Sequence, residues 1–305
     1  MNTHILDCTT IYIPQIVEDE RIGSVFNELF KLIDATESAS TEHIEWDFRQ
    51  VSFLHPFFIA PLAIFKHASS RIIIITNVTS TLKSYFETIH FEDCYHIDRD
   101  SCIDELRKYE SRTYIPICSF DVSNNAFDKW QSVIQNIIQK QSKCVKSLTN
   151  PLSYYLSELF CNISQHSKSQ YAFIYSQYLE RNHCLELCIA DTGIGVYSSY
   201  VLSEKYLDLI RSEAEALKLA NEGYSTKNLP NAENRGYGLS TTKRMLVEGM
   251  GGSFFMLSGG AFHRHNQKQN DYINLPPEIN WKGTIILLRI PTIIDKNFDI
   301  YQYIS

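Results

Sequence analysis

A carboxylate, an amide and an imidazole follow one another at four-residue steps in the middle of the chain. These side chains belong to Glu158, Asn162 and His166. The segment 152–166 also carries apolar residues at three- and four-residue steps, which is typical of a helix with one buried face. Because four residues make slightly more than one helical turn, the three polar groups line up as a stripe beside that face.

A second group of candidate residues lies where an apolar strand is expected to end. The sequence LELCIA is followed directly by DTGIG, residues 191–195. A carboxylate in this position is costly unless it has hydrogen-bond donors, and Gly193 and Gly195 allow a sharp turn and the close approach of a flat ligand. Asp191 can therefore accept from the exocyclic amine of an adenine ring. A turn capped by an aspartate is the alternative that so short a motif leaves open.

A third candidate joins a long polar loop, residues 223–238, to a predicted helix. Loops of this length are often lids or binding loops. The loop ends in GYGL, residues 236–239, and glycines there leave backbone N–H groups accessible at the helix start. A helix start favours an anion by about 0.3–1 kcal/mol. A loop followed by a glycine N-cap is the alternative, and the pair Gly283–Thr284 on the last strand predicts little by itself.

The order of these motifs resembles the GHKL ATPase superfamily, which includes gyrase-type ATPases, heat-shock chaperones and histidine kinases. The resemblance covers roughly residues 115–295: E-x-x-x-N-x-x-x-H on a helix, D-x-G-x-G after a strand, a loop ending in G-x-G-L, and G-T on a strand. It implies an ATP-binding domain with helices on one face of a mixed sheet. It also implies ATP and Mg²⁺ as ligands.

The resemblance assigns a role to each motif residue. Glu158 would act as general base on water or a substrate hydroxyl, and Asn162 would bind Mg²⁺ through its amide oxygen. His166 would contact phosphate, or else bond to nearby backbone at the helix end. The other nucleotide-binding residues that it implies are Asp191, Gly193, Gly195, Lys227, Arg235, Gly236, Gly238, Leu239 and Thr284.

Within that set, Asp191 would read adenine, with Gly193 and Gly195 shaping its pocket and Thr284 supporting it. The glycines of GYGL would let the lid close over the phosphates. Lys227 and Arg235 of the lid would meet phosphate, or else remain solvated charges. The helix motif looks most like the anti-sigma-factor serine kinases of bacterial partner switching. A sensor histidine kinase would carry an acceptor motif of the H-E-x-R kind before this domain. The preceding segment of this chain contains none.

The first hundred residues alternate predicted strands and helices, so we expect a small α/β unit with a parallel or mixed sheet. RIIIITNV is expected to be its fully buried strand. The segment EWDFRQVSFLHPFFIAPLAIF is similar to the central strand–helix part of STAS domains. His55 and Pro56 stand where that family has an aspartate and a phosphorylatable serine. The resemblance therefore implies a docking module or pseudo-substrate; a generic α/β module that dimerises or docks is the alternative.

The bulk composition excludes several classes of protein. The chain has 305 residues, of which 44% are hydrophobic and 21% charged, as in globular proteins, and its formal net charge is -7. An acidic chain is a poor match for nucleic acid or for an anionic membrane surface. Neither a membrane-spanning apolar run nor a signal-peptide pattern is present in the sequence. Eight scattered cysteines without a C-x-x-C pair suggest reduced thiols and a cytoplasmic location.

Two cysteine and histidine groups offer an alternative site. Cys94, His96 and Cys102 are close in sequence, and His263 and His265 alternate in a segment expected to be a polar loop. Either group could bind zinc, but neither has paired ligand spacing, so ordinary core or loop residues are the favoured interpretation.

We therefore expect an α/β (α+β sandwich) protein with three parts. These are a STAS-like regulatory domain, residues 1–110, a histidine kinase-like ATP-binding domain, residues 115–295, and a C-terminal tail, residues 296–305. The expected function is Mg-ATP-dependent regulation of a protein partner by hydrolysis or phosphorylation. A non-catalytic ATP-gated switch and a fold with an inactive nucleotide site are the alternatives. The sequence leaves open whether the protein forms a homodimer.

Overall fold

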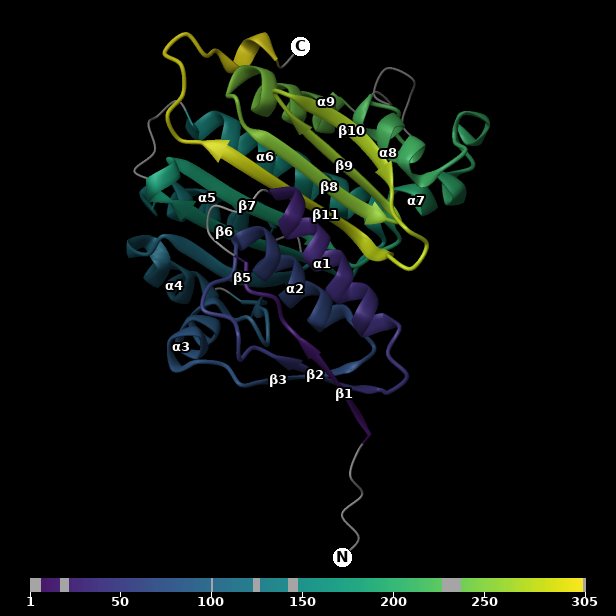
Figure 1. Cartoon of the computed structure of the whole chain (residues 1–305). Coiled ribbons are helices and arrows are strands. Elements are labelled where there is room, and N and C mark those ends of the chain that lie inside the picture. The colour runs from purple at the N-terminus through teal and green to yellow at the C-terminus, as the bar shows by residue number, and fades with distance from the viewer. Residues whose placement is uncertain are drawn as a thin grey trace, which may run out of the picture. The chain divides into compact units, whose positions relative to one another are not determined.

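The computed structural model describes residues 7–16, 22–99, 101–122, 127–141, 148–226 and 237–303 (Figure 1). The chain divides into two compact units, Met1–Cys94 and Tyr95–Ser305. The first contains a parallel sheet and the second a mixed sheet, each with helices between its strands. This confirms the predicted α/β class.

The first unit follows the predicted alternation of strands and helices. Within its described residues, the strands pair in parallel in the order β1-β2-β3. A parallel pair needs a crossover connection, which the intervening helices provide. Its elements are β1 (Cys8–Tyr12), α1 (Ile22–Glu37), β2 (His43–Asp47), α2 (Pro56–Ala68), β3 (Ile72–Thr76) and α3 (Ser80–Ile89).

The start of α2 shows why this apolar segment forms a helix. Pro56 occupies the first turn, where a missing N–H costs nothing. The side chain of His55 caps the helix, because its Nδ1 accepts from the Phe57 backbone N–H at 3.1 Å. His55 is itself buried. His55 and Pro56 thus begin a helix.

The prediction that RIIIITNV forms a fully buried strand is wrong. In β3, Ile72 and Ile74 are 45% and 50% exposed, whereas Ile73 between them is buried. Successive side chains of a strand point to opposite faces, so only one face of β3 packs into a core. A run of isoleucines does not reveal that one face stays open.

The second unit contains the segment in which the motifs lie. Two of its helices continue as π-helical turns, α6 at Ile163–Ser167 and α9 at Met245–Gly249. Its main elements are β4 (Tyr95–Ile97), α4 (Ser101–Arg107), β5 (Tyr114–Asp121), α5 (Phe127–Gln141), α6 (Thr149–Asn162), β6 (Tyr171–Leu179), β7 (Cys184–Asp191), α7 (Gly195–Ser203), α8 (Glu213–Asn221), α9 (Tyr237–Arg244), β8 (Ser253–Gly259), β9 (Ala261–Asn266), β10 (Gln269–Asn274) and β11 (Trp281–Pro291).

These strands form one sheet in the described residues, in the order β10-β9-β8-β11-β7-β6-β5-β4. All neighbours are antiparallel except β4 and β5. Helices α5, α6 and α9 pack on one face of the sheet through a shared apolar core (Figure 1). Representative buried residues of that core are Ile134, Leu152, Leu159, Ile174, Leu187, Leu239, Met256 and Ile286.

Two segments pack with the second unit although the sequence places them elsewhere. Residues 95–110 were expected in the N-terminal domain, but β4 pairs with β5 at Ile97 and Phe120, and Leu106 joins the second core. The unit boundary therefore falls at residues 94–95 rather than at 110–115. In the C-terminal tail, Phe298 and Tyr303 pack against the same core.

Local details also differ from the sequence-based expectations. The polar segment before the last strand forms the antiparallel strands β9 and β10 rather than a loop. Helix α6 begins at Thr149, directly after Leu148. None of the helices in the described part of the chain is long and apolar enough to cross a membrane.

Candidate functional site

A cavity lies on the helix-covered side of the second unit's sheet, among residues of α6, β7, α7, α9 and β11. It encloses about 800 Å³ of empty space, including the part open to solvent. Apolar side chains form most of its wall. They are Leu159, Ile163, Ile189, Val196, Ala220, Leu239, Met256 and Ile286.

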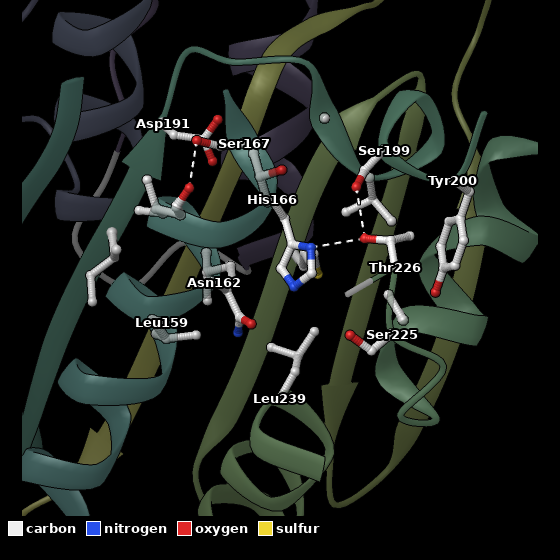
Figure 2. A pocket seen from close by; sticks show the side chains of 18 of the residues that line it. Leu159, Asn162, His166, Ser167, Asp191, Ser199, Tyr200, Ser225, Thr226 and Leu239 are labelled. Carbon is white, nitrogen blue, oxygen red and sulfur yellow. Dashed lines mark hydrogen bonds between the residues drawn. The ribbon is translucent and has the colours of Figure 1, made fainter. Parts of the chain in front are cut away.

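Residues from each of the four sequence motifs meet at this cavity. Figure 2 shows Asp191 at one end, Asn162 and Leu239 toward the other, and the ring of His166 between them. Of the residues that the resemblance implied, those lining the cavity are Asn162, His166, Asp191, Gly195, Leu239 and Thr284. Lys227, Arg235 and Gly236 lie outside the described residues.

Asp191 is the buried carboxyl of the site, with 3% of its surface exposed. Its Oδ1 accepts from the Gly193 backbone N–H at 2.8 Å. Burial raises the pKa of Asp191 to about 7, against the opposing effect of hydrogen bonds from the backbone N–H groups of Gly193 and Thr284. The cavity therefore contains an acceptor whose charge changes near neutral pH.

Two glycines allow the chain to close around Asp191. A Cβ atom at Gly193 would collide with the Ser167 carbonyl, because the turn packs closely on the end of α6 and Ile194 N–H donates to that carbonyl at 2.8 Å. Gly283 has φ +90° and a Cβ there would collide with the Asp191 carbonyl. The glycine of G-T is thus explained by the backbone approach between β7 and β11.

The stripe on α6 changes direction after Asn162. The helix passes into its π-helical turn at Ile163, which inserts extra backbone and shifts the side chains that follow. The His166 Nδ1 lies 2.8 Å from the Thr226 Oγ1, and that hydroxyl lies 3.0 Å from the Ser199 Oγ (Figure 2). His166 therefore has a side-chain partner at the start of the long polar loop.

Glu158 does not line the cavity in the described structure, but it lies beside it. Its carboxylate contacts the backbone of Gly238, so a Cβ at that glycine would collide with it. Gly238 belongs to the first turn of α9, directly before the cavity residue Leu239. The predicted base and the second glycine of GYGL are thus adjacent.

Two cavity residues on α7, Ser199 and Tyr200, carry no motif that identifies them in the sequence, whereas Tyr224 and Ser225 belong to the long polar loop. Tyr200 of α7 donates from its hydroxyl to the Tyr224 carbonyl at 2.5 Å, and both residues line the cavity with Ser199 and Ser225. Isolated serines and tyrosines on helices are too common to predict a site. Their place beside the cavity depends on the packing of α7.

The alternative cysteine and histidine groups have ordinary packing roles. The Cys102 Sγ lies 3.9 Å from the His96 carbonyl. His263 lies on β9, its Nε2 is 2.9 Å from the Asn270 Oδ1, and its ring stacks on Tyr272 at 3.9 Å. No group of three histidine, cysteine, aspartate or glutamate residues in the described ranges could hold a metal ion.

A scan of the chain against protein-family models found no match, and a search among curated proteins found none that matches significantly. The family resemblance of each unit therefore stays a prediction.

Proposed function

We propose that this protein is a GHKL-type regulator that binds Mg-ATP and either hydrolyses it or phosphorylates a protein partner. The observation that supports this is the convergence of four separate motifs on one cavity, through Asn162, Asp191, Leu239 and Thr284. Four motifs that are distant in sequence supply side chains to one cavity, as expected if they serve one ligand. ATP is the ligand that their combined chemistry fits best.

The two ends of the cavity suit the two ends of a nucleotide. Near Asp191, apolar walls and a buried carboxyl fit a flat base that carries an amine. Toward the other end, Asn162 offers an amide oxygen, a type of ligand that Mg²⁺ accepts. The first turn of α9 is close by, and backbone N–H groups at a helix start favour phosphate.

Bound Mg-ATP would supply a reactive terminal phosphate with part of its charge neutralised. The chain's own contribution is to position the nucleotide and to move a proton. Glu158 lies one helical turn before Asn162 and carries the carboxylate that would accept that proton from water or from a hydroxyl. Its contact with Gly238 holds the carboxylate at the start of α9.

The test is ADP release from Mg-ATP by the purified protein and two variants. We expect Glu158→Gln to bind ATP but to turn it over about 10²- to 10⁴-fold more slowly, and Asn162→Ala to lose Mg²⁺-dependent binding. Glu180→Gln, in the turn between β6 and β7, is the control and should behave as wild type. Wild-type protein that fails to bind ATP would overturn the proposal. Unchanged turnover in Glu158→Gln would show that Glu158 is not the general base.

An ATP-gated switch without chemistry is the second candidate, with the N-terminal unit as a STAS-like docking module. Helix α7 supports it, because Ser199 and Tyr200 line the cavity while Val201 and Leu202 of the same helix are exposed apolar residues. Such a helix could report ligand binding to a partner protein. Partner binding that survives Glu158→Gln but is lost in Asn162→Ala would favour the switch.

The composition also bears on where the protein works. The described cysteines are free thiols, which supports a reducing, cytoplasmic location. The net charge of -7 supports a protein partner rather than a nucleic acid.

A further inference from the structure

Three polar side chains form a row across neighbouring strands at the Asp191 end of the cavity. Asp191 of β7 pairs with Thr284 of β11, and Thr284 pairs with Ser258 of β8. Paired residues of adjacent strands project from the same face of a sheet. Asp191 and Thr284 line the cavity, whereas Ser258 lies next to them with only 3% of its surface exposed.

The hydrogen bonds of Ser258 determine which way its proton points. A serine hydroxyl has one proton to donate and two lone pairs to accept with. The Ser258 Oγ accepts from the Val196 backbone N–H at 2.9 Å. It lies 3.0 Å from the Gly283 carbonyl, which can only accept, so the Ser258 proton is committed to that oxygen.

The hydroxyl of Thr284 has to supply the remaining hydrogen bond. Its Oγ1 lies 3.0 Å from the Ser258 Oγ, whose only proton is already used. Thr284 must therefore donate to Ser258, and this leaves only lone pairs for the cavity. Above about pH 7 the carboxyl of Asp191 is ionised, and it then also only accepts. Together, Asp191 and Thr284 present an edge of acceptors.

We propose that Ser258 is a specificity-determining residue that makes Thr284 an acceptor and thereby selects a nucleobase with an amine over one with a carbonyl at the same position. This inference rests on the proposed ATP binding. An exocyclic amine has two N–H groups to donate to this edge. A carbonyl oxygen in its place would meet acceptors without an intervening proton, and such unpaired buried polar groups are strongly disfavoured.

The test compares, at about pH 8 where Asp191 is ionised, the dissociation constants of ATP and inosine triphosphate, which carries a carbonyl where ATP has the amine. In Ser258→Ala, the Thr284 proton becomes available to the carbonyl oxygen. We expect the preference for ATP over inosine triphosphate to fall about five- to tenfold. If Ser258 only supports the fold, both dissociation constants rise by the same factor, and an unchanged ratio overturns the inference.

A second variant keeps the test decisive if Ser258→Ala does not fold. Thr284→Val removes the hydroxyl, so the amine of ATP loses an acceptor, whereas the carbonyl of inosine triphosphate no longer faces an opposing lone pair. The preference for ATP over inosine triphosphate should therefore fall again. Ser203→Ala is the matched control, because its hydroxyl donates to the Tyr200 carbonyl on α7 and should leave the ratio unchanged. Failure of the wild type to bind ATP would overturn the proposed function, whereas ATP binding with a ratio that neither variant changes would overturn only the role of Ser258.

Discussion

Burial of a single carboxyl sets the chemistry of the cavity. Asp191 ends a strand whose residues are all buried, and this raises its pKa to about 7. The folded carboxyl holds its proton up to that pH, whereas an unfolded one loses it near its ordinary value of 3.8. Its contribution to stability is therefore present below about pH 4 and is lost as the pH rises toward 7. The hydrogen bond from an amine has the opposite trend, because the ionised carboxylate is the stronger acceptor.

The resulting prediction concerns ATP affinity between pH 6 and 8. We expect the dissociation constant of ATP to fall as the pH rises through about 7, and Asp191→Asn to bind more weakly and without this dependence. Glu186 is the control, since burial also raises its pKa to about 7, and Arg289 rather than the cavity is its partner. A pH dependence that Asp191→Asn retains and Glu186→Gln abolishes would contradict the assignment.

At the scale of elements, helices α6 and α9 meet through a carboxylate and a glycine. Glu158 on α6 occupies the space that a side chain at Gly238 would need. The obstacle is the far end of a flexible side chain, so it can rotate away at little cost to the fold. The position of the carboxylate, rather than the stability of the fold, depends on this glycine.

We therefore expect Gly238→Ala to reduce ATP turnover about a hundredfold, as misplacement of a catalytic group by about 1 Å does. Its free energy of unfolding should change by only about 1 kcal/mol. Gly23→Ala is the matched control, because nothing lies within 4 Å of a Cβ there and turnover should be unchanged. Steady-state ADP release and denaturant unfolding measure both quantities, and wild-type turnover in Gly238→Ala would refute the role of the contact.

At the scale of the whole molecule, each compact unit has a core of its own. Trp46 of the first unit is fully buried, and its Nε1 donates to the Thr36 Oγ1 at 3.1 Å. The core that includes Leu159 and Ile286 is built from residues of the second unit. Two cores allow two unfolding transitions, of which only one involves the cavity.

Calorimetry of the full chain should resolve these transitions. Mg-ATP at a hundred times its dissociation constant should stabilise only the second unit, by about 2.7 kcal/mol. Trp46→Ala should destabilise only the first, by about 3–5 kcal/mol. A single transition that responds to both changes would show that the units unfold together.

Short-range patterns in the sequence are sufficient to predict the α/β class and to single out the cavity residues Asn162 and Asp191, whereas Thr284 is singled out only by the order of the motifs. Asn162 and Asp191 are each tied to their own element by periodicity or by neighbouring glycines, which are local properties of the chain. The exposed face of β3 could not be predicted, because a buried and a half-buried isoleucine strand have the same composition.

The contacts between the side chains of the site depend on how the elements pack and pair. His166 meets Thr226 because a π-helical turn follows Asn162, and Ser258 meets Thr284 because of the register between β8 and β11. The pairing of β4 with β5 likewise moves residues 95–110 into the second unit. Residue type and local spacing are enough to indicate which residues can do chemistry. Strand register and helix packing decided their partners, because these depend on contacts between residues that are distant in the chain.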